Sequence, residues 1–304
     1  MDTVYHIPAM LQETIEGLHI QPDGIYVDVT FGGGGHSRAI MKGLNDGGKL
    51  FSFDQDIEAF ENAVESGEWK VGSGKWTFVH SNFRYLRNWM DYYGIEAIDG
   101  LLADLGVSFH HFDCPERGFS FRFSAPLDMR MNQTAKRTAA DIVNSYSEEE
   151  LAKVLYLYGE MKNSRGIAKN ICRSRAQKRI ERTEDLVVAS RIPAEMSKEL
   201  ARLFQALRIE VNDEMGALRE MLVAARDLLK PGGRIAILTY HSLEDRLVKN
   251  FLRSGNLEGT IEKDFYGNIL TPFELIEKGR EASPEEVEQN PRARSAKLRV
   301  AAKR

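Results

Sequence analysis

The stretch that decides the fold is Tyr26-Val27-Asp28-Val29-Thr30-Phe31-Gly32-Gly33-Gly34-Gly35-His36-Ser37. A β-branched, apolar run that carries one acid leads directly into four glycines, and a helix-like stretch over 37–44 follows. A strand, a glycine turn and a helix N-terminus in this order predict a site for the ribose or phosphate part of a nucleotide-like ligand. Glycine permits backbone angles that a Cβ would forbid, and it lets a ligand approach the main chain.

Strand-like and helix-like patterns alternate around this stretch. We expect strands over 25–30, 49–53, 76–80, 98–103 and 234–240, and an edge strand over 296–301. We expect helices over 9–18, 57–64, 84–93, 214–229 and 242–252. This alternation predicts an α/β fold whose parallel sheet carries helices on both faces.

The pattern changes between the fourth and fifth strands. From Phe109 to about Val211 we find helices and loops but no convincing strand. A capping box, Ser147-Glu148-Glu149-Glu150, opens a helix that reaches about Tyr158, and further helices are expected over 163–179, 184–191 and 197–207. The simplest organisation is one α/β domain, 1–108 and 212–304, interrupted by a helical insertion over 109–211.

Composition limits the class of protein. The chain has 304 residues, of which 42% are hydrophobic and 28% charged, as in soluble globular proteins. No apolar run approaches the ~18 residues of a membrane span, and the first residues lack the features of a signal peptide. Cys114 and Cys172 lie far apart without metal-ligand spacing, so we expect a reducing, cytoplasmic compartment and no metal site. A net charge of −4 confines any nucleic-acid contact to local patches.

The glycine run does not fit the dinucleotide fingerprint Gly-x-Gly-x-x-Gly/Ala. Its last position falls on Ser37 when counted from Gly32 and on Arg38 when counted from Gly33, which disfavours a nicotinamide or flavin cofactor. An acid within the strand that precedes a glycine turn, as Asp28 does here, is typical of methyltransferases. Their cofactor, S-adenosylmethionine, carries no phosphate, and its methionyl end lies along the glycines.

Three side chains that follow predicted strands are placed to bind this cofactor. Asp54, at the tip of the second strand, is expected to accept hydrogen bonds from both ribose hydroxyls, and such a charge-assisted bond contributes ~1.5–3 kcal/mol. Phe83 follows the third strand and could cover the adenine, and Asp104 ends the fourth strand at the same crevice. Each feature alone has an ordinary explanation: a tight turn, a surface cap or a core aromatic. Their joint occurrence, with Lys230-Pro231-Gly232-Gly233 before the fifth strand, predicts an S-adenosylmethionine site.

Longer strings resemble the RsmH (MraW) family, the small-subunit (16S) ribosomal RNA cytosine-N4 methyltransferases. The resemblance covers essentially the whole chain. It is carried by Thr30-Phe31-Gly32-Gly33-Gly34-Gly35-His36-Ser37, Leu102-Ala103-Asp104-Leu105-Gly106-Val107-Ser108, Arg117-Gly118-Phe119-Ser120-Phe121, Pro126-Leu127-Asp128-Met129-Arg130-Met131, Phe204-Gln205-Ala206-Leu207-Arg208-Ile209, His241-Ser242-Leu243-Glu244-Asp245-Arg246 and Asn290-Pro291-Arg292-Ala293-Arg294-Ser295.

The resemblance implies a class I S-adenosylmethionine-dependent methyltransferase fold, Rossmann-like, with an inserted all-helical domain. It implies as substrate a cytidine in the decoding centre of the small ribosomal subunit. Where this chain has His111 the family often has Gln, and where it has Phe109 the family commonly has Ser. An imidazole donates one hydrogen bond with a different reach from that of an amide. Carried over by position, the implied cofactor contacts are Gly34, Gly35, His36, Asp54, Phe83, Asp104 and His111.

The chemistry requires an acceptor near the cytosine amine, because its lone pair is delocalised into the ring. Amino-methyltransferases often place an Asn/Asp/Ser-Pro-Pro-aromatic motif after the fourth strand, whereas this chain has Asp104-Leu105-Gly106-Val107 there. The candidate catalytic acceptors are therefore Asp104, a backbone carbonyl of this loop, and His241 at the tip of the fifth strand. His241 also has an ordinary structural explanation.

Two basic segments are candidates for contact with RNA phosphates, which an enzyme that acts on an unstacked base requires. Residues 162–182 carry eight basic side chains against one acid, and residues 292–304 carry six against none. A solvated helix face and a disordered tail are the ordinary explanations, and the resemblance favours RNA contact by the insertion. Two alternatives to the methyltransferase stay open: a non-catalytic ribosomal RNA-binding or assembly factor, and a methyltransferase with a different substrate such as DNA or protein.

Overall fold

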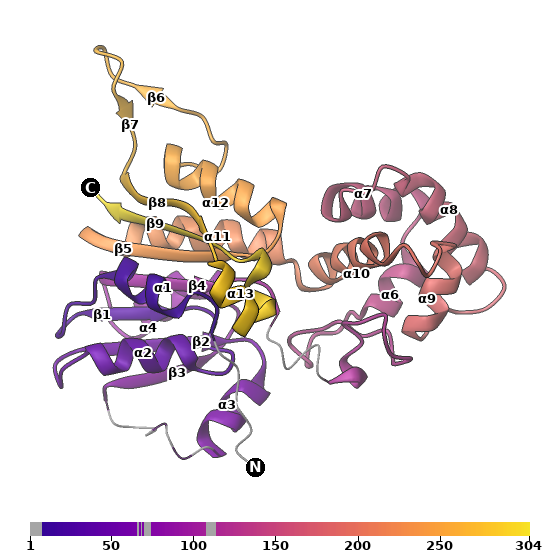
Figure 1. Cartoon of the computed structure of the whole chain (residues 1–304), viewed down its shortest axis with the longest axis horizontal. Coiled ribbons are helices and arrows are strands. Elements are labelled where there is room, and N and C mark those ends of the chain that lie inside the picture. The colour runs from indigo at the N-terminus through magenta and orange to yellow at the C-terminus, as the bar shows by residue number, and fades with distance from the viewer. Residues whose placement is uncertain (1–7, 66, 68, 70–73, 108–113) are drawn as a thin grey trace. The chain divides into compact units, whose positions relative to one another are not determined.

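Seven strands form one sheet in the order β3-β2-β1-β4-β5-β9-β8 (Figure 1). The structure, a computed structural model, describes residues 8–65, 67, 69, 74–107 and 114–304. Strands β1 to β5 run parallel to their neighbours in this set, and β9 runs antiparallel to β5 and β8. The strands are β1 (Ile25–Asp28), β2 (Lys49–Asp54), β3 (Trp76–His80), β4 (Ile98–Asp104), β5 (Leu229–Thr239), β8 (Phe273–Glu281) and β9 (Lys297–Lys303).

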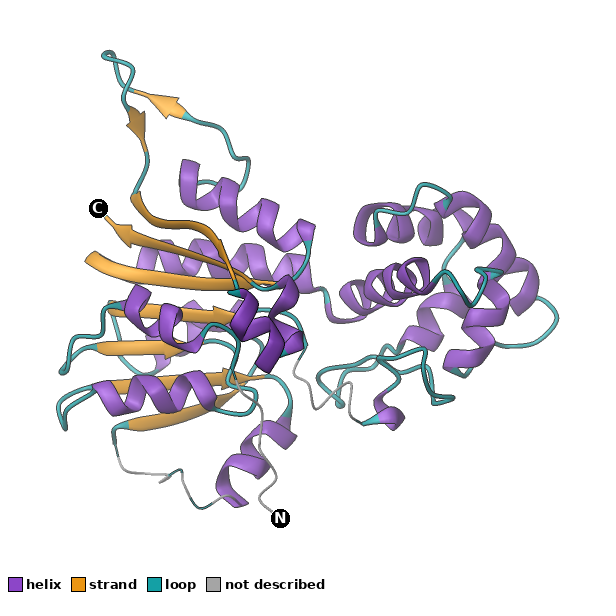
Figure 2. Ribbon diagram, viewed as in Figure 1, coloured by secondary structure: helices purple, strands orange, loops and turns teal. Residues whose placement is uncertain are grey.

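Helices cover both faces of this sheet (Figure 2). Apolar residues at helical spacing explain their packing: in α11, Leu218, Met221, Leu222 and Ala225 are all buried. The predicted α/β class with a mostly parallel sheet is confirmed. The helices are α1 (Leu11–Leu18), α2 (Gly35–Gly43), α3 (Ile57–Glu65), α4 (Leu86–Tyr92), α11 (Glu214–Leu228), α12 (Ser242–Ser254) and α13 (Pro284–Gln289), with 3-10 turns η1 (Phe83–Tyr85) and η3 (Pro291–Ser295).

The edge of the sheet differs from the sequence prediction. The strand predicted over 296–301 exists as β9, but it lies between β5 and β8, so the edge strand at this end of the sheet is β8. The sequence does not reveal β8 because five of the nine residues in Phe273–Glu281 are charged and Gly279 interrupts them. Such charge suits an edge strand, where it opposes pairing with other chains. A separate two-stranded sheet, β6 (Glu262–Lys263) with β7 (Ile269–Leu270), precedes β8.

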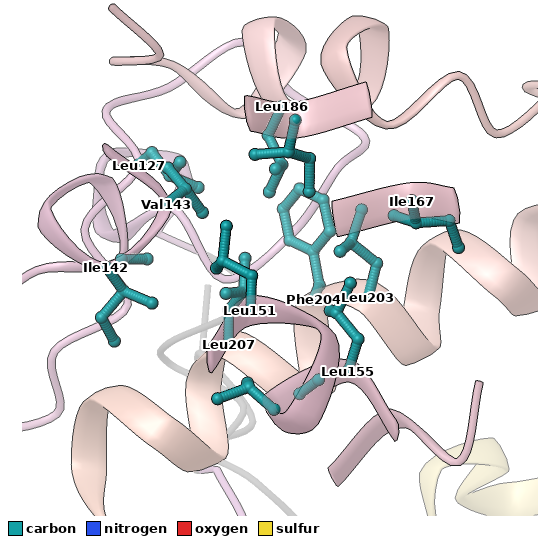
Figure 3. Packing of buried hydrophobic residues seen from close by; sticks show 14 of the residues in the cluster. Leu127, Ile142, Val143, Leu151, Leu155, Ile167, Leu186, Leu203, Phe204 and Leu207 are labelled. Carbon is teal, nitrogen blue, oxygen red and sulfur yellow. The ribbon is translucent and has the colours of Figure 1, made fainter. Parts of the chain in front are cut away.

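Residues Val107–Met215 form a compact unit of their own, and the rest of the chain forms the other. This unit extends a few residues beyond the predicted 109–211, because α10 continues to Asn212. Its own apolar core contains Leu151, Leu203 and Phe204 (Figure 3). Its helices are α6 (Ala139–Ser145), α7 (Glu148–Gly159), α8 (Ser164–Arg175), α9 (Thr183–Ser190) and α10 (Ser197–Asn212), with a 3-10 turn η2 (Pro115–Arg117).

The capping box at Ser147 is confirmed, since Ser147 Oγ accepts from Glu150 N and the Glu150 carboxylate accepts from Ser147 N. A second capping box, between Thr138 and Asp141, opens α6, which the sequence does not predict.

Within the described part of the unit, strand pairing is limited to one isolated bridge, Pro126–Arg182. None of the helices in the described ranges combines the length and hydropathy that crossing a bilayer requires.

Candidate active site

The candidate site lies at the carboxyl edge of the parallel strands. Asp28 ends β1, Asp54 ends β2 and Asp104 ends β4. Asp28 pairs with Ser52 of β2, and β1 also pairs with β4 through Asp28 and Leu102, so these strand ends are neighbours. Ligands of open α/β sheets bind outside this edge, at the point where the strand order reverses.

Asp28 anchors the glycine turn from within the protein. It is fully buried; its Oδ2 accepts from Ser37 Oγ at 2.6 Å, and its Oδ1 accepts from Thr30 N at 3.1 Å. Burial raises the pKa of Asp28, and the hydrogen bond from Ser37 opposes this change. The Thr30 hydroxyl in turn accepts from Asp104 N at 2.6 Å, which ties the turn to β4. The acid inside the first strand therefore fixes the turn and is itself sealed from solvent.

Gly34 and Gly35 are required by side chains that pack against the turn. Gly34 has a φ of +74°, and a Cβ there would lie 2.8 Å from Phe31 Cζ and 2.9 Å from Trp69 Cζ2. A Cβ on Gly35 would collide with the Pro8 ring. No side chain among the described residues caps α2, so its first N–H groups remain for a polar ligand.

Replacing Gly34 by Ala tests this packing. The left-handed backbone costs about 1–2 kcal/mol for a residue with a Cβ, and displacing two aromatic rings adds about 1–3 kcal/mol. Gly94→Ala is the matched control, because Gly94 has a φ of +68° and a Cβ there would meet nothing within 4 Å. Urea denaturation should show a larger loss of unfolding free energy for Gly34→Ala; equal losses would contradict the packing argument.

Asp54 joins the second strand to the glycine turn. Its Oδ2 accepts from Gly32 N at 2.8 Å, and its Oδ1 accepts from Asp56 N at 2.9 Å. These bonds place the carboxylate beside the glycine turn, at the end of β2. Its bonds to two ribose hydroxyls stay a prediction.

Phe83 opens η1 directly after β3 and is half-buried. The turn is set by Asn82, whose Oδ1 accepts from Arg84 N at 2.9 Å. Since β3 pairs with β2 in parallel, with His80 opposite Asp54, Phe83 follows a strand end that neighbours Asp54. An aromatic side chain there is suitable for covering an adenine ring.

Asp104 accepts a hydrogen bond from a residue that the sequence analysis does not single out. The Tyr240 hydroxyl donates to Asp104 Oδ1 at 2.7 Å, and His36 Nδ1 lies 3.6 Å from Asp104 Oδ2. Burial raises the pKa of Asp104 to about 7, the Tyr240 hydrogen bond opposes this rise, and the negative charge of Glu244 adds to it. A carboxyl group with this pKa exchanges its proton near neutral pH.

The hydrogen bonds of His36 define its tautomer. Its Nε2 lies 3.2 Å from the carbonyl oxygen of Ala9, and because a carbonyl only accepts, Nε2 carries the hydrogen. Burial lowers the pKa of His36, so the ring is neutral at pH 7 and Nδ1 is an acceptor. Nδ1 and Asp104 Oδ2 are thus two acceptors that face each other, an arrangement that favours a donor between or beside them.

Comparison with known proteins identifies the family. A sequence model of the MraW methylase family matches residues 3–304. The chain belongs to the MraW methylase family. It is similar to proteins named ribosomal RNA small subunit methyltransferase H: 56% identical to that of Phocaeicola vulgatus, over 99% of this chain and 98% of the relative, and 57% identical to that of Parabacteroides distasonis, over the same shares. The protein of that name from Cytophaga hutchinsonii is 50% identical over 98% of this chain and 99% of the relative.

Membership in the MraW methylase family makes the chain a methyltransferase that uses S-adenosylmethionine. The predicted class I methyltransferase fold is confirmed, because the parallel strands β3-β2-β1-β4-β5 continue into the antiparallel β9. His111, predicted to contact the cofactor, lies outside the described residues.

His241 has a structural role in this MraW methylase. It caps α12, where its Nδ1 accepts from Glu244 N at 3.4 Å, and its Nε2 lies 3.1 Å from Glu244 Oε1. That approach is an ion-pair distance, and Nε2 has no hydrogen bond of good geometry among the described residues. With Nδ1 accepting, the neutral ring carries its hydrogen on Nε2 and has no acceptor left for a cytosine amine. The geometry therefore favours Asp104 over His241 as the acceptor.

Sequence reasoning missed Tyr240 and the anchoring role of Thr30. A signal for Tyr240 exists: it directly follows β5, whose Leu238 pairs with Asp104. A tyrosine at that position is within reach of an acid at the end of the neighbouring strand. The bonds of Thr30 have no comparable signal, because its hydroxyl bridges two strands through a backbone N–H.

Proposed function

We propose that this chain transfers a methyl group from S-adenosylmethionine to the exocyclic N4 amine of a cytidine in small-subunit ribosomal RNA, within the decoding centre and in the cytoplasm. The relatives are named for small-subunit ribosomal RNA. The observation that carries the proposal is Asp104, an acceptor with a pKa of about 7 at the carboxyl edge beside the glycine turn. The resemblance of the sequence to cytosine-N4 methyltransferases supplies the target atom.

The residues at this edge fit the cofactor. Asp54 holds its carboxylate beside the glycine turn, Phe83 follows the neighbouring strand, and Gly34 and Gly35 open a helix whose first N–H groups lack a side-chain cap among the described residues. We assign cofactor contacts to these residues and to His36 and Asp104. When bound, S-adenosylmethionine supplies a methyl group already activated on a sulfonium. The protein must then position the amine and accept its proton.

Asp104 is suited to accept the proton that the amine loses during methyl transfer. The amine nitrogen uses its lone pair to form the new C–N bond, the C–S bond breaks, its electron pair stays on sulfur, and one N4 proton must leave. A base whose pKa lies near the operating pH is best suited to take it, and the pKa of Asp104 is about 7. In the ionised form its Oδ2, which is not bonded to Tyr240, is the oxygen available to the amine.

A stripe of basic residues on α8 is suited to RNA phosphates. Arg165, Lys169 and Arg173 recur every four residues and are exposed, while Ile167, Ala168 and Ile171 bury the other face. In the described part of the chain none of the three is paired with an acid. We call Arg165, Lys169 and Arg173 the α8 stripe.

The other basic side chains of 162–182 are mostly engaged within the protein. Lys178 pairs with Asp185, Arg179 with Asp141, and Arg175 Nη1 donates to Val143 O. The second basic segment is not a disordered tail: in β9, Arg299 bonds to Asp245 at 2.7 Å, and Lys303 Nζ donates to the carbonyl oxygen of Arg226. The α8 stripe is therefore the better candidate for RNA contact.

Asp54→Ala is expected to weaken binding of S-adenosylmethionine tenfold or more, since the loss of one charge-assisted hydrogen bond exceeds the ~1.4 kcal/mol that corresponds to tenfold. Asp54→Asn separates the effects: it keeps an acceptor for Gly32 N and loses part of the capacity for ribose. Calorimetric titration with the cofactor checks both variants. An affinity equal to that of the wild type in both would contradict the assignment.

Methyl transfer to small subunits that lack the modification tests the proposed function. Labelled methyl groups should appear in ribosomal RNA as N4-methylcytidine after nuclease digestion and nucleoside analysis. Cofactor binding without transfer at saturating cofactor would instead support a non-catalytic assembly factor. Label in a different nucleoside, or on DNA or protein only, would support a different substrate.

A further inference from the structure

Tyr240 stands at the junction between β5 and α12, with its ring against the loop that follows β4. Its N donates to Glu244 Oε2 at 3.0 Å, which fixes the backbone before the first turn of α12. Its Cδ2 lies 3.7 Å from where a Cβ on Gly106 would be, so the ring lies beside that glycine. Its hydroxyl donates to Asp104 Oδ1 at 2.7 Å. The ring is thus held from two elements while its hydroxyl meets the acid.

The direction of this hydrogen bond is defined by the ionisation of the two groups. Burial raises the pKa of Tyr240 well above its usual value, and the negative charge of Asp104 adds to this rise. The phenol therefore keeps its proton throughout the neutral range and acts as the donor. A donor bound to a carboxylate stabilises the ionised form.

The other titratable groups around Asp104 do not replace this donor. Glu244 is an acid whose negative charge disfavours ionisation of Asp104, and the negative charge of Asp104 in turn disfavours ionisation of the buried Asp28. His36 is buried and neutral at pH 7, and it turns an acceptor nitrogen towards Asp104 Oδ2. Among the described residues, the Tyr240 hydroxyl is the side-chain donor that the structure gives to the Asp104 carboxyl.

We propose that Tyr240 is a positioning residue for methyl transfer: its hydroxyl fixes the rotation of the Asp104 carboxyl and favours its ionised form, leaving Oδ2 for the ligand. The inference rests on the proposed role of Asp104. Tyr240 touches neither amine nor methyl group in this scheme and acts through the acid alone. Removal of the Tyr240 hydroxyl should therefore have its largest effect at low pH, where Asp104 is easily protonated.

Tyr240→Phe removes the hydroxyl and keeps the ring. The loss of the donor should raise the pH at which Asp104 ionises by about one unit. Binding of S-adenosylmethionine, measured by calorimetry, should then be about fivefold weaker than in the wild type at pH 7 and equal within about twofold at pH 9. Dividing the affinity of the variant by that of the wild type at each pH cancels the effect of the ionisation of the cofactor itself.

Tyr26→Phe is the matched control, because Tyr26 OH is also hydrogen-bonded, accepting from Gln21 N at 2.7 Å, and Tyr26 lies in β1, two residues before the strand end at Asp28. This variant should show the same affinity ratio at every pH. The thermal midpoint of unfolding shows that both variants are folded. Should Tyr240→Phe unfold under these conditions, carboxyl carbon NMR at low temperature, assigned with Asp104→Asn, reads the ionisation midpoint of Asp104 directly.

An affinity ratio for Tyr240→Phe that is independent of pH, or that moves further from one as the pH rises, would overturn the inference. An unshifted NMR midpoint of Asp104 would do the same. Failure of the wild-type protein to bind the cofactor at any pH would instead count against the proposed function. Weaker binding at pH 7 that recovers at pH 9 supports the positioning role.

Discussion

Asp104→Asn is expected to lower the rate of methyl transfer by about a hundredfold or more, which corresponds to about 2.7 kcal/mol of barrier. The reason lies in the bond from Tyr240. Because the Tyr240 hydroxyl donates to Oδ1, the side-chain amide of this variant should place its oxygen there and its NH2 where Oδ2 lies in the wild type. A donor would then replace the acceptor that faces the amine. The size of the side chain is unchanged, so a loss of rate reports chemistry.

The measurement is a single-turnover transfer of labelled methyl groups to small subunits that lack the modification. Asp99→Asn is the control: Asp99 is also in β4, and its carboxylate accepts from Ile25 N and Lys230 Nζ at the opposite end of the sheet. It should keep a rate within about threefold of the wild type. A rate for Asp104→Asn in the same range would rule out Asp104 as the proton acceptor.

The pH profile provides a second check on Asp104. The folded protein holds this carboxyl protonated up to about pH 7, because burial raises its pKa from 3.8. The proposed acceptor is the ionised form, so the wild-type rate should fall as the pH decreases through about 7. In Asp104→Asn the residual rate should not follow this dependence.

Neutralising the α8 stripe is expected to weaken binding to the small subunit by about tenfold to a hundredfold. The triple variant Arg165→Gln, Lys169→Gln and Arg173→Gln removes three positive charges that are exposed and unpaired with acids among the described residues. Loss of three phosphate contacts should reduce the slope of log affinity against log salt by about two. Cofactor affinity should not change, because these residues lie in the separate helical unit.

The matched control removes the same net charge elsewhere. Lys42, Lys49 and Lys249 are exposed residues of the other unit, and their replacement by Gln should leave the salt slope unchanged within about 0.5. Filter binding or fluorescence titration at several salt concentrations gives both slopes. Equal losses in the two triple variants would mean that the α8 stripe contributes only net charge, and the assignment of an RNA surface would be wrong.

The sequence predicts the part of the fold that has periodicity. Buried runs and the glycine turn define β1 to β5, and apolar spacing defines α11 and most of the insertion helices. The charged β8 and the short α6 carry too little pattern to be recognised, and the misplaced edge strand follows from missing β8. Strand order beyond the parallel part depends on pairing between distant residues, which local pattern does not encode.

The candidate site is predictable to the extent that acids follow strands. Asp54 and Asp104 are found in this way, because parallel strands bring their ends to one edge. The sequence does not predict the direction of hydrogen bonds or the orientation of side chains. Examples are which nitrogen of His36 carries hydrogen, and that His241 turns both ring nitrogens towards Glu244. These features depend on contacts between segments far apart in the chain. Tyr240 belongs to the same group, since its importance arises only from meeting Asp104.

The placement of β9 has a consequence for synthesis of the protein. This strand completes the interior of the sheet between β5 and β8, yet the ribosome makes it after both. Until residue 303 has been added, β5 and β8 each expose an unpaired edge, and a nascent chain in that state is prone to join with others. A protein of this design is therefore exposed to aggregation until β9 has been made and has paired with both neighbours.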